Sequence, residues 1–341
     1  MTKWLETTGI DEDVVVSTRI RVARNLEKYK FPNLIGSEDS ESLTQDIQEA
    51  LRDVGEDYDF YSNRNLNEVE RNVFVEKHLI SPNLSKKVDK GSFFIRKDEK
   101  STIMINEEDH IRIQVLLPGL NLEEGWNICS EIDDEIEKNI KYAFHEKFGY
   151  LTACPTNTGS GLRASVMLHL PALGMIGQIN NIMEALRKMG LTVRGLYGEG
   201  SKALGNLYQI SNQTTIGEKE EDTIKKINKI VYQIVARERN SRKYLLDQSE
   251  VELEDKVFRS LGILNYSRVI STLEAMNHLS NVKLGTDMGI IKDIKSKEII
   301  NLMLDIQPAS IQNIQDKDID TKQVDILRGE TLRRKLKNME E

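Results

Sequence analysis

The stretch "CPTNTGSGLRASVMLHLP" (154–171) decides how this sequence is interpreted. Small and polar residues lead to Gly159 and Gly161, and Arg163 then opens an alternating apolar run that Pro171 ends. The alternation predicts a strand, and the glycines predict a loop whose backbone approaches something closely. An arginine beside such a loop favours phosphate as the ligand, because its planar fork binds two oxygens at once.

Two familiar phosphate motifs fit this sequence only in part. "GSGLRA" (159–164) has dinucleotide-motif spacing, but it precedes a strand where that motif opens a helix. "GLYGEGSK" (195–202) has P-loop spacing, but Ser201 precedes Lys202, the reverse of the required order. Neither motif therefore accounts for the loop, and what it binds stays open at this point.

Composition narrows the class of protein. The chain has 341 residues, 39% of them hydrophobic, and a net charge of −8 from 47 basic and 55 acidic side chains. This length predicts two domains, and the acidic balance argues against direct nucleic-acid binding.

No apolar run approaches the roughly 18 residues of a membrane span, and "MTKWLETTGIDED" lacks the apolar segment of a secretory signal. Cys129 and Cys154 form neither a disulfide framework nor a CxxC motif, so we expect a cytoplasmic protein without structural zinc.

Hydrophobic periodicity predicts the main elements. In the strand expected at 13–22, one face carries Val14, Val16, Thr18, Ile20 and Val22, and the other carries Val15, Ser17, Arg19 and Arg21. Further strands are expected on both sides of a turn within 101–115, at 164–170 and near 191–195. Helices are expected at 38–53, 176–190 and 271–280, and from about 218 until the polar stretch 237–255. We place a domain boundary near 250, between a catalytic domain (1–250) and a helical C-terminal domain (251–341).

Arginines and carboxylates recur at the strand ends and glycine turns. The arginines are Arg19, Arg21, Arg112, Arg163 and Arg194. Any one of them could be solvated or ion-paired, but five favour an anion site. "NEEDH" (106–110) supplies Glu107, Glu108 and Asp109, and Glu199 follows in another glycine turn. On its own, such an acidic turn is usually a solvated loop. Beside five arginines, its carboxylates suggest a transferase site in which they hold a cationic acceptor and the arginines hold an anionic donor. Cys154 alone could equally be a small core residue, and His78 and His110 lack metal-ligand spacing.

Five strings in the same order and spacing carry a family resemblance. "STRIRVARN", "KHLISP", "NEEDHIRI", "GYLTACPTNTGSGLRASVMLHLP" and "VRGLYGEGS" resemble the phosphagen kinases, the family of arginine and creatine kinase, over roughly residues 14–235. The similarity is greatest to the bacterial branch that acts on arginines in proteins. It implies an α+β fold with a large curved antiparallel sheet flanked by helices, followed by a helical C-terminal domain. The implied activity is ATP-dependent phosphorylation of protein arginine side chains, with Mg²⁺ held by phosphate oxygens and water.

The resemblance also assigns roles to residues. Glu108 becomes the catalytic base, Glu199 the carboxylate that orients the guanidine, and Cys154 a thiolate that tunes the reaction. The implied nucleotide-binding residues are Ser17, Thr18, Arg19, Ile20, Arg21, His78, Arg112, Arg163, Ala164, Ser165, Val166, Met167, Arg194, Gly195, Leu196, Tyr197 and Gly198.

Departures from the small-molecule kinases of the family point to a protein substrate. Those enzymes carry about a hundred helical residues ahead of the "STR" strand, which begins here near residue 14, so we expect a site open to an arginine within a polypeptide. Tyr197 and Met167 stand where the small-molecule enzymes tend to have arginine and histidine. The resemblance gives the C-terminal domain a role in dimerisation and in recognising substrate or phosphoarginine. The Arg-Asp-x-x-Arg-Ala motif for phosphoarginine is missing from 319–329, however, and the single Arg-Asp pair is Arg52-Asp53.

The implied partners and the remaining alternatives follow from this resemblance. It implies protein substrates with accessible arginines, a homodimer, a zinc-finger activator, a stress-gene repressor and a Clp ATPase or protease, in a pathway that marks proteins for stress response and degradation. The alternatives are a kinase for a small free guanidino compound, a non-catalytic adaptor that binds phosphoarginine, and a simple nucleotide-binding module. Paired Glu108 and Glu199 argue against the last two, because binding alone does not need them.

Overall fold

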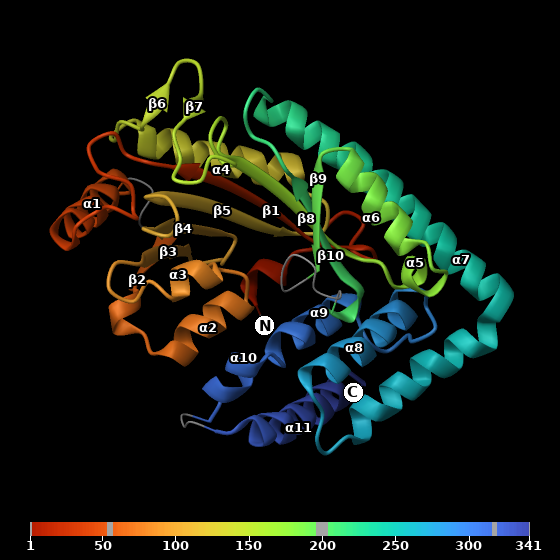
Figure 1. Ribbon diagram of the computed structural model, residues 1–341. Coiled ribbons are helices and arrows are strands. Elements are labelled where there is room, and N and C mark those ends of the chain that lie inside the picture. Colours follow the sequence, from red (N-terminus) through yellow and green to blue (C-terminus); the bar gives the residue numbers. More distant parts are fainter. Residues whose placement is uncertain (1, 53–56, 196–203, 316–318, 341) are drawn as a thin grey trace.

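Among the residues that the structure describes, an eight-stranded antiparallel sheet forms the centre of the fold (Figure 1). This computed structural model describes residues 2–52, 57–195, 204–315 and 319–340. Helices flank the sheet and also form the C-terminal part, which confirms the predicted α+β fold class. The order across the sheet is β2 (Tyr58–Ser62), β3 (Ser92–Arg96), β4 (Ser101–Ile105), β5 (Ile111–Pro118), β1 (Val15–Arg24), β8 (Leu162–His169), β10 (Leu207–Asn212) and β9 (Leu191–Gly195).

One face of the sheet is apolar and covered by helices. Alternate residues of the central strands, such as Ile20, Ile113 and Val166, are fully buried in this first core. The covering helices present their own apolar stripes to it. They are α1 (Ser37–Ala50), α4 (Leu122–Glu137), α6 (Ile179–Lys188) and the first part of α7 (Glu220–Tyr266).

The opposite face is partly polar and partly covered by a second core. Phe93, Met104 and Leu116 of the sheet pack there with helices from both ends of the chain. Those helices are η1 (Lys3–Leu5), α8 (Thr272–Asp287), α9 (Ser296–Asp305) and α11 (Thr321–Glu340), and Figure 1 shows the C-terminal ones grouped below the sheet. Packing therefore ties residues beyond 250 to the sheet domain.

Shorter elements complete the chain. They are η3 (Asn63–Asn65), α2 (Glu68–Glu76), α3 (Pro82–Ser85), the hairpin β6 (Phe144–His145) and β7 (Gly149–Tyr150), α5 (Pro171–Met175), η4 (Leu204–Asn206) and α10 (Pro308–Asn313).

The first strand departs from the predicted alternation at one end. A bulge between Val15 and Ser17 shifts its register against β8. As a result Val15 joins the first core with Val14, whereas Val16 joins the second core. The predicted faces of Val15 and Val16 were wrong, because an extra residue at a bulge reverses the side-chain alternation before it.

Two predicted helices have different limits. The helix expected at 176–190 is α6, which is shorter (Ile179–Lys188), and Gly177, at a φ of +74°, separates it from α5, which ends at Met175. The helix expected from 218 until residue 237 continues into the polar stretch and is interrupted only at Ser249, whose φ of −151° is not helical, so α7 consists of two helices joined at a kink. Solvated polar residues do not end a helix whose other side is packed. In the part of the chain described, no helix combines the length and hydrophobicity needed to cross a membrane.

Candidate active site

Five arginines gather on the polar face of the sheet. In the antiparallel register, Arg21 lies opposite Arg163 of β8, and Ala23 lies opposite Arg112 of β5. Arg194 of β9 lies opposite Gln209 of β10. Because strand residues alternate between faces, these pairings place all five arginines, Arg19 included, on the side opposite the first core.

Burial of the arginines and repulsion between them both oppose their positive charges on this face. Burial, followed by the charges of Arg112 and Arg163, lowers the pKa of Arg19 to about 10. Burial and the same neighbours, with Arg19, hold the pKa of Arg21 well below its usual range. Among the described residues, the Nε of Arg21 is buried and makes no hydrogen bond. Since a guanidinium stays protonated in proteins, the arrangement favours a bound polyanion.

Two polar residues of β10 accept hydrogen bonds from arginines of this face, and the sequence patterns had not pointed to them. Arg19 Nη2 donates to Gln209 Oε1 at 2.6 Å, and Arg163 Nη2 donates to Ser211 Oγ at 3.2 Å. Leu207, Gln209 and Ser211 alternate with Tyr208 and Ile210, and this two-residue period was the signal that could have found them.

A cavity of about 330 Å³ opens beside the arginines, a size in the range of ligand pockets. The expected nucleotide residues that line it are Ser17, Arg19, Arg21, His78, Met167, Arg194 and Gly195. His78 has a positive φ of 63°, and burial together with the charge of Arg19 lowers its pKa to about 4. The imidazole is therefore neutral at physiological pH and adds no charge to the arginine face.

Four of the expected nucleotide residues point the other way. Ile20, Ala164 and Val166 are fully buried in the first core. Thr18 Oγ1 donates to the Gly119 carbonyl at 2.7 Å. The side chains of these four residues do not face the cavity, because a contiguous strand segment presents only every second side chain to one face.

The carboxylates of the "NEEDH" turn have different environments. Glu107 is buried, with Oε2 2.7 Å from Arg112 Nη1, and it accepts a hydrogen bond from Ser81 Oγ at 2.6 Å. Although burial alone would raise its pKa, these partners hold the pKa below its ordinary value. Glu108 is exposed, unlike the buried Glu107 and Asp109, but neighbouring atoms still shield part of its carboxylate from water. This partial burial, followed by the charges of Glu107 and Asp109, raises the pKa of Glu108. Glu107 is thus the ion-paired support of the turn, and Glu108 is the carboxylate available to a substrate.

The loop that carries Cys154 packs directly against this turn. The Ala153 N–H donates to Asp109 Oδ1 at 2.7 Å, and the Asn157 side chain hydrogen-bonds Glu108. Cys154 is half-buried, with its sulfur 3.0 Å from Thr156 Oγ1. The contacts of Ala153 and Asn157 place Cys154 and Glu108 on adjacent loops.

The glycines of this loop approach the protein rather than a ligand. A Cβ on Gly159, whose φ is +118°, would lie 2.4 Å from the Thr215 carbonyl oxygen. One on Gly161 would lie 2.6 Å from Arg24 Nη1. The predicted close approach of these glycines is therefore an approach to the chain itself, at Thr215 and Arg24. A phosphate-binding role of this loop stays a prediction.

Part of the predicted site lies outside the described residues. Leu196, Tyr197, Gly198 and Glu199 belong to the segment 196–203. His110 is described and is structural: its Nδ1 accepts from the Leu26 N–H at 3.1 Å, and its Nε2 lies 2.8 Å from the Lys30 carbonyl. Across the described ranges, no three histidine, cysteine or acidic side chains form a group that could hold a metal.

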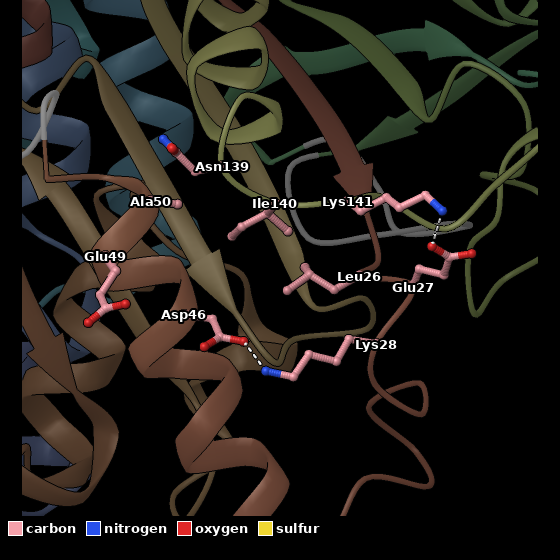
Figure 2. Close-up of a pocket in the computed structure, with 9 residues that line it drawn as sticks. All are labelled: Leu26, Glu27, Lys28, Asp46, Glu49, Ala50, Asn139, Ile140 and Lys141. Carbon is pink, nitrogen blue, oxygen red and sulfur yellow. Dashed lines mark hydrogen bonds and ion pairs between the residues drawn. The ribbon is translucent and has the colours of Figure 1, made fainter.

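A larger hollow of about 780 Å³ lies elsewhere, between α1, the segment after β1 and the end of α4 (Figure 2). Its charged side chains are paired. Lys28 lies 3.0 Å from Asp46 and Lys141 lies 2.6 Å from Glu27, and Glu49 lies 3.9 Å from Arg52. None of the expected site residues lines this hollow.

Comparison with known proteins agrees with this geometry. The profile "ATP:guanido phosphotransferase, C-terminal catalytic domain" matches residues 40–241. A solved lombricine kinase aligns over 68% of both chains, with 26% identity and a TM-score of 0.59. A taurocyamine kinase from Schistosoma mansoni aligns over 75% of this chain and 39% of its own, with 25% identity and a TM-score of 0.61. The chain belongs to the ATP:guanido phosphotransferases.

Full-length relatives define the branch. The protein-arginine kinase of Brevibacillus brevis is 46% identical over 99% of this chain and 96% of its own length. That of Halothermothrix orenii is also 46% identical, over 98% and 97%. The profile "Protein-arginine kinase McsB C-terminal domain" matches residues 250–341. Within the guanidino kinases, the chain is a member of the protein-arginine kinase family.

Proposed function

We propose that this protein transfers the γ-phosphoryl group of ATP to a guanidino nitrogen of arginine side chains in proteins. The observation that carries the proposal is the juxtaposition of a five-arginine face with an exposed glutamate, Glu108, whose neighbouring loop bears Cys154. The five-arginine face suits a triphosphate, and Glu108 suits a cationic acceptor.

The donor side works by positioning and by neutralising charge. Arg19, Arg21 and Arg163 lie where they can bind phosphate oxygens, while Arg112 is kept in place by Glu107. The fixed guanidinium groups would stabilise charge that develops on the transferred phosphoryl group. Mg²⁺ would enter with the nucleotide and screen the phosphate charges. Its ligands would be phosphate oxygens and water, because Mg²⁺ keeps much of its hydration shell.

The acceptor must lose a proton before or as it reacts. An arginine guanidinium stays protonated throughout the physiological pH range and is no nucleophile in that form. In the proposed step a guanidino nitrogen attacks the γ-phosphorus, the bond to the β–γ bridging oxygen breaks, and its electron pair leaves with ADP. Glu108 takes the proton, and its raised pKa brings it nearer to the working range of a general base. Glu199 is proposed to grip the other guanidino nitrogens, and Cys154 to stabilise charge without forming a bond.

The cellular setting is part of the proposal. The relatives named above support a protein substrate over a free guanidino compound. We expect cytoplasmic location and a homodimer built with the C-terminal domain (251–341), as the family resemblance implies. A zinc-finger activator, a stress-gene repressor and a Clp ATPase or protease remain expectations of the same kind.

The decisive experiment maps the product. The purified chain is incubated with ATP, Mg²⁺ and a basic bacterial protein, and acid-labile phosphoarginine is located by mass spectrometry. We expect phosphoarginine on the protein together with release of ADP. Phosphorylation of free guanidino compounds alone would favour the small-molecule alternative, and binding of phosphoarginine without ADP release would favour the adaptor.

A further inference from the structure

The cavity beside the arginines has a second wall that comes from the C-terminal helices. Met276 of α8 and Ile300, Met303 and Leu304 of α9 line it together with Arg19. The four apolar side chains are at most 9% exposed, so they form a closed boundary rather than a surface patch. α8 also contacts η4, the turn that leads into β10 of the sheet.

The cavity therefore has both a charged and an apolar lining. Arg19, Arg21 and Arg194 line it from the sheet. Met167 of β8 and Leu207 of β10 line it together with the wall from α8 and α9. A ligand that fills the whole cavity must carry negative charge for the arginines and an apolar body for the helices.

We propose that α8 and α9 form one wall of the binding site for the nucleobase of ATP. The proposal rests on the proposed function, in which the arginines bind the phosphates. A nucleobase is flat and largely apolar, and methionine thioethers pack favourably on aromatic rings. Met276 and Met303 on the C-terminal side and Met167 on the sheet side supply such thioethers. A guanidinium is a poor occupant, because Arg19, Arg21 and Arg194 line the same cavity and would repel it.

A carboxylate fixes the position of this wall relative to the site. Glu76, the last residue of α2, accepts hydrogen bonds from the Ala309 and Ser310 N–H groups, each at 2.7 Å. It also lines the cavity, and His78 follows two residues later. Glu76 thus connects the segment that presents His78 to the start of α10, directly after α9. Nucleotide affinity should consequently depend on the C-terminal helices, although the phosphates are bound by the sheet.

The test compares a ligand that has a base with one that lacks it. The affinities of ATP and of inorganic tripolyphosphate are measured by calorimetry on the full chain and on Met303→Ala. We expect Met303→Ala to weaken ATP binding by about three- to tenfold, the range of a sulfur–aromatic contact, and to leave tripolyphosphate binding within about twofold. Leu302→Ala is the matched control, because Leu302 is fully buried on the same helix but does not line the cavity.

Either of two results would overturn the proposal. An equal loss for ATP and tripolyphosphate would mean that α9 acts only on the arginines, and no loss for either would place the base elsewhere. If Met303→Ala does not fold, as judged by circular dichroism and thermal melting, Met276→Leu replaces it as a volume-conserving change, with the same selective loss expected. Phosphoarginine formation by the wild-type chain is measured in parallel, so that failure of this proposal can be told from failure of the kinase function.

Discussion

Arg21 lies directly opposite Arg163 across β1 and β8, so that two guanidinium groups of like charge are neighbours in the sheet. Like charges placed opposite each other destabilise a strand pair, and burial adds to the cost. The chain keeps this arrangement at the centre of its polar face, where a polyanion would relieve it.

Anion binding should accordingly stabilise the fold. We expect ATP or tripolyphosphate at one hundred times its dissociation constant to raise the free energy of unfolding by about 2.7 kcal/mol, visible as a higher Tm. Arg163→Met should remove the repulsion, leaving the ligand-free protein at least as stable as wild type while reducing the ligand-induced rise. Thermal melting of both proteins with and without tripolyphosphate checks this. A ligand-free variant well below wild-type Tm would show that Arg163 stabilises the sheet.

Glu108→Gln should retain nucleotide binding and lose turnover by roughly 10² or more, the usual scale of a general base. ADP release with an arginine-containing protein measures the turnover. Glu107→Gln is a useful contrast, because it breaks the ion pair with Arg112 and should lower Tm as well as activity. Near-wild-type turnover of Glu108→Gln would remove this residue from the mechanism.

The pH dependence of turnover should reflect the same carboxylate. Partial burial and the charges of Glu107 and Asp109 raise the Glu108 pKa, so the proton-accepting form is lost at a higher pH than for an ordinary glutamate. As pH falls, kcat should decline through an apparent pKa above that ordinary value, and Glu108→Gln should abolish this step. A rate that stays flat down to the pH of unfolding would contradict the assignment.

Arg163→Lys should impair catalysis although the charge is kept. A lysine cannot present the bidentate fork, and a lost charge-assisted hydrogen bond costs about 1.5–3 kcal/mol, or roughly tenfold or more in rate. Nucleotide affinity and turnover are measured together on the purified variant. If the Arg163→Lys variant keeps full activity, Arg163 acts only through its positive charge.

Cys154→Ser should slow the enzyme less than Glu108→Gln, since the thiol is assigned to charge stabilisation and lies 3.0 Å from the Thr156 hydroxyl. Turnover of both variants gives the comparison, and rapid quenching tests for a phosphorylated cysteine. Trapping a phosphocysteine during turnover would make Cys154 a nucleophile and reverse this role.

The acceptor should be an arginine within a polypeptide. We expect kcat/KM to be higher for an unstructured arginine-containing protein than for free arginine, because contacts with the surrounding chain can orient the guanidine. The net charge of −8 should add attraction for basic targets that weakens as salt rises. Assays of both substrates at two ionic strengths decide this, and equal or better use of free arginine would favour the small-molecule alternative.

The sequence determined the elements whose signal is local. The alternation around Arg19, Arg21 and Arg163 predicted strands. The helix expected at 271–280 is the first part of α8, where the Glu274 N–H donates to Ser271 Oγ at 3.3 Å. The motif strings identified the family before any geometry was known. These inferences hold because strand periodicity and helix capping depend on residues within a few positions of one another.

Tertiary structure decided which residues meet. The bulge that moves Val16 to the second core, the Thr215 carbonyl that fills the space beside Gly159, and the contact of Arg19 with Gln209 all depend on partners far away in the sequence. The cavity wall formed by Met276 and Met303 is of the same kind, since nothing local to α8 or α9 points to a nucleotide. Periodicity fixes the face on which a side chain lies, but only long-range packing fixes what lies opposite it.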